Sequence, residues 1–142
     1  MSEQERLQSL VLELRVLEGY LKEIDVRESV VARAIIESRS ALEAIKGFSS
    51  SSSSEVLMPI GGGVFLEAST PPLDKLIINV GAGVVIEKTK QETVDFLEER
   101  IKEFESAIQN FEVQKSDLAS KINENRVTIN SIVEKQKRSQ QS

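Results

Sequence analysis

The chain has 142 residues, 18 Lys and Arg against 23 Asp and Glu, a formal net charge of −5, and no Cys, His or Trp. Without Cys and His it lacks thiolate and imidazole metal ligands, the commonest general base and any cysteine nucleophile. Its acidic balance argues against nucleic-acid binding, because phosphate contacts require a surplus of Lys and Arg. No apolar run approaches the roughly 20 residues that span a bilayer, and the polar N-terminus does not resemble a signal peptide. We therefore expect a soluble cytoplasmic protein that is not an enzyme and uses no metal, cofactor, membrane or nucleic acid.

Composition divides the chain into three parts. Residues 1–46 and 90–142 are charged and contain one glycine and no proline, whereas residues 47–89 hold the other six glycines, all three prolines and a run of six serines, Ser49–Ser54. We predict an N-terminal coiled-coil helix, then an oligomerisation body made of a Ser-rich linker and two β-hairpins, then a C-terminal coiled-coil helix. These parts cover residues 1–47, 48–88 and 89–138, within a single domain over residues 1–142.

Both outer parts carry an apolar side chain every three or four residues. In the first part this seam consists of Leu7, Leu10, Leu14, Leu17, Leu21, Ile24, Glu28, Val31, Ile35, Ser38, Leu42 and Ile45. In the last part it consists of Val94, Leu97, Ile101, Phe104, Ile108, Phe111, Lys115, Leu118, Ile122, Asn125, Ile129 and Ile132. A repeat of 3.5 residues held over this length is typical of a coiled coil, because it keeps one apolar seam facing a partner helix. A long helical bundle is the alternative.

The expected ends of the helices agree with this pattern. Ser2 with Glu5, and Thr89 with Glu92, each fit a capping box, and Gly47 suits a left-handed residue that ends the first helix. The two seams have equal lengths of roughly 58 Å each, so they can lie antiparallel within one chain. Both termini then meet at a shared tip.

The middle of the chain changes period. Residues 56–60 and 64–68 are β-prone and separated by a glycine turn, and the same arrangement recurs in residues 76–80 and 84–88. Each pair predicts a β-hairpin. Pro59 restricts its strand to an edge or a bulge, and the serine run is most simply a flexible linker.

These hairpins leave apolar strand edges that a single chain does not cover. Eight strands can close a barrel, and two copies of the segment would supply eight. The expected fold is therefore α+β and mainly α: a long antiparallel two-helix coiled coil with two central β-hairpins that join an intersubunit β-barrel. The expected assembly residues are Val56, Leu57, Ile60, Val64, Phe65, Leu66, Ile77, Ile78, Val80, Val84, Val85 and Ile86.

Apolar side chains also lie off the seam near the tip. They are Val11, Leu12, Val16, Val127 and Val133. Such side chains either support an interchain contact or form an adhesive surface. We also expect the last turns of the helices to splay and expose seam residues.

Two segments of the middle region resemble a known family. Residues 58–65, MPIGGGVF, and above all residues 80–89, VGAGVVIEKT, are similar to the alpha-type subunit of archaeal prefoldin. The order of helix, two hairpins and helix agrees with this resemblance over nearly the whole chain, since beta-type subunits have one hairpin.

The resemblance implies a hetero-hexamer of two alpha and four prefoldin beta subunits, with β-barrels bearing coiled coils. It implies an ATP-independent chaperone that captures unfolded client proteins with its tips and delivers them to a group II chaperonin. The matching client-binding residues here are Leu7, Leu10, Val11, Leu14, Ile129, Ile132 and Val133. The alternative is a structural coiled-coil scaffold that tethers partners without binding clients.

Overall fold

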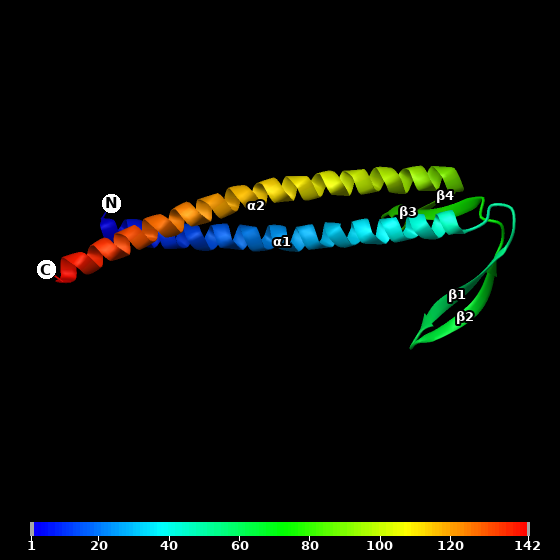
Figure 1. The fold of residues 1–142 in the computed structure, drawn as a ribbon, viewed down its shortest axis with the longest axis horizontal. Coiled ribbons are helices and arrows are strands. Elements are labelled where there is room, and N and C mark those ends of the chain that lie inside the picture. The colour runs from blue at the N-terminus through cyan, green and yellow to red at the C-terminus, as the bar shows by residue number, and fades with distance from the viewer. Residues whose placement is uncertain (1, 142) are drawn as a thin grey trace. The chain divides into compact units, whose positions relative to one another are not determined.

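A computed structural model describes residues 2–141 of the chain. The elements in chain order are α1 (Glu3–Gly47), β1 (Ser54–Gly61), β2 (Val64–Thr70), β3 (Lys75–Gly81), β4 (Val84–Thr89) and α2 (Lys90–Gln141), labelled in Figure 1. The strands form two separate antiparallel pairs, β1 with β2 and β3 with β4. The mainly helical α+β fold with two central hairpins is therefore confirmed. Neither helix in the described part of the chain is long and apolar enough to cross a membrane.

The predicted capping boxes form at both helix starts. Glu5 N–H donates to Ser2 Oγ over 3.1 Å, and Ser2 N–H donates back to Glu5 Oε2 over 3.4 Å. At α2 the corresponding distances are 3.1 Å from Glu92 N to Thr89 Oγ1 and 3.2 Å from Thr89 N to Glu92 Oε1. The hydrogen bond from the backbone of Thr89 lowers the pKa of Glu92, because it favours the ionised carboxylate.

The prediction of a left-handed cap at Gly47 is wrong. Helix α1 includes Gly47, which is absent from the described residues with positive φ. The helix instead ends in a tighter turn, in which Phe48 N–H donates to Ile45 O over 3.3 Å. The Lys90 ammonium then donates to Phe48 O over 2.9 Å, which places a cation at the carbonyl end of α1.

The chain divides into two compact units. The terminal unit holds residues 2–33 and 105–141, and the central unit holds residues 34–104. In the terminal unit α1 and α2 are antiparallel, and every predicted seam residue there is buried or half-buried. The most buried include Ile24, Ile122 and Ile132, with exposed fractions of 9%, 6% and 7%. The predicted seam is therefore confirmed in this unit.

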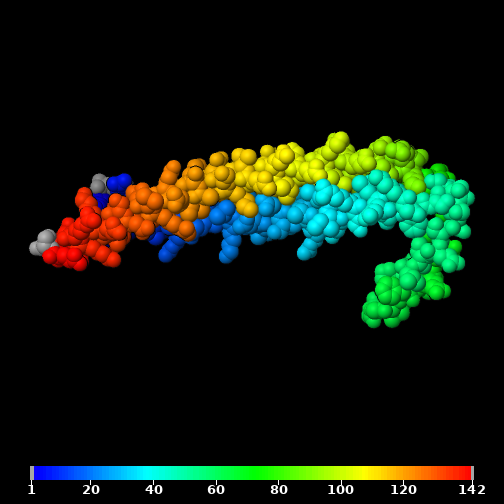
Figure 2. All heavy atoms as spheres, viewed as in Figure 1, coloured from blue at the N-terminus to red at the C-terminus, as the bar shows by residue number. Residues whose placement is uncertain are grey.

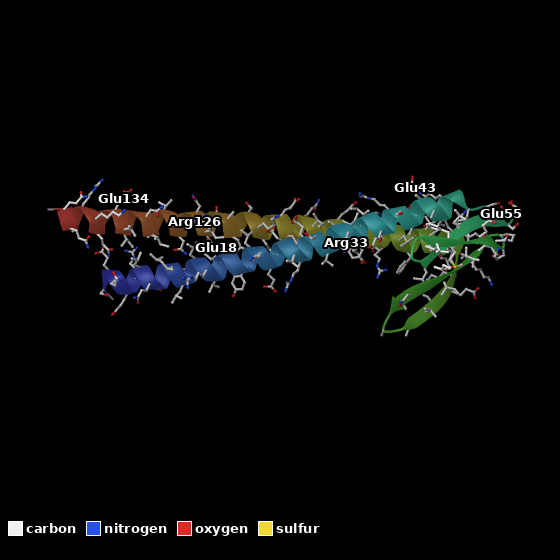
Figure 3. The ribbon with its side chains drawn as sticks, turned by 90° about the horizontal axis from the view of Figure 1, so that it is seen from below. Glu18, Arg33, Glu43, Glu55, Arg126 and Glu134 are labelled. Atoms are coloured by element: carbon white, nitrogen blue, oxygen red, sulfur yellow. The ribbon has the colours of Figure 1, made fainter. Side chains whose placement is uncertain are left out.

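Ion pairs tie the two helices together along the terminal unit. Arg126 Nη2 lies 2.8 Å from Glu18 Oε1, and Figure 3 shows the two residues on facing stretches of the helices. Within the seam, Lys115 Nζ lies 3.1 Å from Asp25 Oδ1 and 3.3 Å from Glu28 Oε1. Hydrogen bonds to Asp25 and then to Glu28 raise the pKa of Lys115, because both carboxylates favour the charged ammonium. In this antiparallel register the two polar seam residues Glu28 and Lys115 meet each other.

The central unit continues the seam and connects it to the hairpins. Ile35, Leu42, Ile45 and Ile101 are buried there, as predicted. Thr93 is 4% exposed, and its hydroxyl donates to Thr89 O over 2.8 Å. The first turn of α2 is thereby held within the packed part of this unit.

The serine run is more ordered at its start than a flexible linker requires. The hydroxyl of Ser49 accepts hydrogen bonds from the backbone N–H groups of Ser51 and Ser52, at 3.2 and 3.1 Å. Ser49 O accepts from Leu73 N over 2.9 Å, so the beginning of the run is attached to the connection between the two hairpins. This turn uses the local hydrogen-bonding tendency of serine.

Each hairpin closes through a two-residue turn with positive φ at both central positions. These residues are Gly62 and Gly63 in the first turn, and Ala82 and Gly83, with φ of 53° and 77°, in the second. Such turns match the right-handed twist of the strands, and an alanine in this region carries strain that glycine avoids. The strand of Pro59 pairs on one side only, with β2, and its register shifts between Pro59 and Gly61, so the expectation of an edge or a bulge is confirmed. The second hairpin has the same shift between Asn79 and Gly81.

Candidate functional site

The predicted client-binding residues lie at the distal end of the terminal unit, and they differ in accessibility. Leu7, Leu10, Leu14 and Ile129 are half-buried seam residues, and Ile132 is buried with 7% exposed. Both helices continue as far as Glu3 and Gln141, and because Ile132 is buried the seam is closed at this position rather than splayed. Val11 and Val133, the two members off the seam, are also half-buried.

The most accessible apolar side chains near the tip were not among those residues. Leu12, Val16 and Val127 expose 61%, 52% and 60% of their surfaces. A shallow, almost wholly apolar groove runs over α1 and is lined by Leu7, Gln8, Val11, Leu12 and Arg15. The sequence signal for the exposed side chains was their position off the seam, where the apolar pattern of the coiled coil does not require them.

The first hairpin presents apolar side chains on both of its faces. On β1, Leu57 and Ile60 each expose 64% of their surfaces. On β2, Val64, Phe65 and Leu66 expose 54%, 59% and 53%. Among the predicted assembly residues of this hairpin only Val56 is half-buried. An apolar hairpin exposed to this extent is a surface that strands or helices of another chain can cover.

The second hairpin differs because one of its faces is partly covered. Ile78 is 9% exposed and its partner Ile86 is half-buried, whereas Ile77 and Val85 on the opposite face expose 75% and 60%. The other two predicted residues, Val80 and Val84, expose 42% and 52%. Ile78 is therefore packed within the chain itself, unlike most of the predicted assembly set.

A hollow in the central unit shows what lies beside that covered face. Val80 and Lys88 of the second hairpin line it together with Phe96 and Arg100 of α2. The Arg100 guanidinium lies 5.3 Å from the ring centroid of Phe96 and 5.9 Å from that of Phe104. Both distances are within the range of cation–π attraction.

Groups suited to catalysis or metal binding do not converge in the described residues. No cluster of three or more His, Cys, Asp or Glu side chains in residues 2–141 has the arrangement of a metal site. Glu98 and Glu99, the adjacent carboxylates of α2, are both exposed on the helix surface. The described residues therefore present apolar surfaces on helices and hairpins rather than a catalytic or metal centre.

These features define a class of protein: a subunit with a two-helix coiled coil and a pair of exposed apolar hairpins. The family model described as Prefoldin subunit matches residues 4–135. The chain belongs to the prefoldin family, whose subunits are non-enzymatic components of a chaperone.

Curated relatives and solved structures agree with this assignment. Prefoldin subunit alpha of Nitrosopumilus maritimus is 33% identical over 97% of this chain and 95% of its own length. Prefoldin subunit alpha of Archaeoglobus fulgidus is 35% identical over 70% of this chain and 68% of its own. The crystal structure of the prefoldin beta subunit from Thermococcus strain KS-1 superposes with a TM-score of 0.61 at 19% identity, covering 89% of this chain and 90% of that one. The predicted resemblance to archaeal alpha-type subunits is thus confirmed.

Proposed function

We propose that the chain is a subunit of an ATP-independent holdase that captures unfolded proteins at the distal end of the terminal unit. The observation that carries this proposal is the apolar groove over α1 near the tip, lined by Leu7, Val11 and Leu12 among others. Val133 of α2, which does not line this groove, lies half-buried off the seam in the same unit. Exposed apolar surface on a rigid frame binds unfolded chains without sequence specificity, because burial of apolar groups is non-directional.

The strength of such contacts suits capture and release without nucleotide hydrolysis. Burial of one leucine or valine contributes roughly 1.5–3 kcal/mol, so a single tip holds a client weakly. Several tips on one assembly bind one flexible chain with much higher avidity, because each further contact is intramolecular. A client held by several weak contacts can then pass stepwise to a group II chaperonin, which is the acceptor we propose.

The tips must be assembled for this mechanism, and the hairpins supply the assembly surface. We propose that their strands join those of prefoldin beta subunits in the cytoplasm, in a complex of two alpha and four beta chains. Ile77 and Val85 lie on the exposed face of the second hairpin. Covering the larger of the two contributes about 2–3 kcal/mol per copy. Ile77→Ser with Val85→Ser should therefore shift the native mass of the co-expressed complex toward free subunits.

Client capture is tested with the assembled complex. Replacing Val11, Leu12 and Val133 together by serine should abolish suppression of aggregation of a chemically denatured client while leaving the native mass unchanged. Val113→Ser is the matched control, because Val113 exposes 62% of its surface on α2 but lies far along the helix from the tip. If the triple variant protects clients as well as the control, capture at the tip is refuted. An assembly that is inert toward every client would instead support a structural scaffold.

A further inference from the structure

Helix α1 carries a second apolar row besides its seam. We call Leu12, Val16, Val26 and Val30, with Gly19 between them, the outer stripe. Its four side chains expose 61%, 52%, 61% and 65% of their surfaces. All of these residues lie in the terminal unit. Figure 2 shows side chains of the N-terminal part of α1 projecting from the edge of the helix away from α2.

The spacing of the outer stripe is helical and regular. Its members follow one another at intervals of four, three, seven and four residues, with Glu23 at the one interrupted position. At about 100° per residue these positions lie on the side of α1 opposite the seam, and they extend over roughly 27 Å. The outer face of α2 lacks an equivalent, because Val113 and Val127 are separated by Ser120 and flanked by polar positions.

The charges of this segment are sorted between the two sides of α1. Glu18, Asp25 and Glu28 form ion pairs with basic residues of α2. Arg27 and Glu23 beside the stripe pair with each other over 2.8 Å. The other exposed charges beside the stripe are Arg15, Lys22 and Arg33 against Glu13. Although the whole chain is acidic, the border of the outer stripe is therefore net basic.

The extent of the stripe argues for a transient partner. Its four side chains expose together roughly 400 Å² of apolar surface, about half of what each partner contributes to a stable interface. The stripe is continuous with the tip, since Leu12 also lines the apolar groove with Leu7 and Val11. A stable subunit contact would need a larger area, whereas a chain already captured at the tip could extend along this surface.

We propose that the outer stripe binds amphipathic segments of unfolded clients in which apolar side chains are flanked by Asp or Glu. The inference rests on the proposed function and names the class of client segment that this subunit prefers. A nascent helix fits the stripe, because its apolar side chains recur with the same three- and four-residue spacing. Its acidic flanks complement Arg15, Lys22 and Arg33 on the stripe's border.

The test uses the full chain in the assembly that it forms and labelled peptides of about five helical turns. One peptide carries leucines at heptad spacing flanked by glutamates, and a second carries the same leucines flanked by lysines. Fluorescence anisotropy should show tighter binding of the glutamate peptide. Val16→Ser with Val26→Ser should weaken that binding about tenfold, while Val113→Ser on α2 should leave it unchanged. Arg15→Glu with Lys22→Glu should shift the preference toward the lysine peptide.

The outcomes separate this inference from the proposed function. If the two peptides bind equally, or if the stripe variant binds the glutamate peptide like the wild type, the inference is wrong even where protection by the tip persists. A changed native mass of the stripe variant would assign the surface to contact between subunits, and would also overturn the inference. Failure of the wild-type assembly to protect any client would refute the proposed function instead, whatever the peptides do.

Discussion

Asn125 offers the sharpest test of how the seam is stabilised. Its amide occupies a seam position between the isoleucines at 122 and 129, and it is 6% exposed. A polar amide at a largely buried seam position contributes less to folding than an apolar side chain of similar size. A leucine at this position would instead bury apolar surface among apolar neighbours. We expect Asn125→Leu to raise the free energy of unfolding by about 2 kcal/mol.

The chain supplies a matched control two residues away. Asn123 is exposed on the same helix, so Asn123→Leu should change the free energy of unfolding by less than about 0.5 kcal/mol. Urea denaturation of both variants, followed by circular dichroism, measures the difference. If Asn125→Leu is no more stable than Asn123→Leu, the burial of position 125 in the seam does not set its contribution to stability.

The same variant tests how clients reach the tip. The structure keeps Ile132 buried and the seam closed, and the proposed capture surface lies outside the seam. Tightening the seam should therefore leave suppression of aggregation unchanged. A loss of protection that accompanies the gain in stability would mean that the seam must open for capture, in contradiction to the closed-tip mechanism.

Three further predictions concern the turns and the ionised groups. Ala82→Gly should stabilise the second hairpin by about 0.5 kcal/mol, because the strain of an alanine at positive φ exceeds the entropy cost of glycine. Gly62→Ala in the first turn should have the opposite effect. Thermal denaturation measures both changes. The capping box lowers the pKa of Glu92. Its ionised carboxylate therefore stabilises the fold in full at pH values above the ordinary pKa of glutamate. The stability difference between wild type and Glu92→Gln should therefore shrink as pH falls through the lowered pKa. Asp25 in particular raises the pKa of Lys115. The difference in stability between wild type and Lys115→Met should therefore be fully present at pH values below the ordinary pKa of lysine. It should vanish as pH rises through the raised pKa, and denaturation midpoints along a pH series check both signs.

The heptad pattern predicted most of the side chains that the helices bury, although Thr93, which is 4% exposed, lies outside it. Even the polar seam positions Glu28, Ser38, Lys115 and Asn125 are buried or half-buried as the spacing requires. The reason is that a 3.5-residue period directly specifies one face of a helix. Pro59 was less informative, because the register shift that follows it also occurs after Asn79 in the second hairpin, where there is no proline.

The features that could not be predicted depend on contacts between distant residues. The pairing of Lys115 with Asp25 and Glu28 follows from the antiparallel register, which no local pattern gives. The end of α1 is set partly by Lys90, which lies far along the chain from Phe48. Gly47 was misinterpreted because α1 ends in a tight local turn, from Phe48 N–H to Ile45 O, which needs no left-handed residue.

The two hairpins depend on other chains to different degrees. In the second hairpin Ile78 is buried within the chain, so this hairpin has one face stabilised before any partner binds. In the first hairpin Leu57 and Phe65, on β1 and β2, both remain exposed, and a two-stranded hairpin with no packed face is marginally stable in water. It follows that the second hairpin presents a preformed strand edge, whereas the first gains most of its stability from assembly. In the isolated chain, amide hydrogen exchange should therefore be slower around Ile78 than around Leu57, and assembly should slow exchange most in the first hairpin.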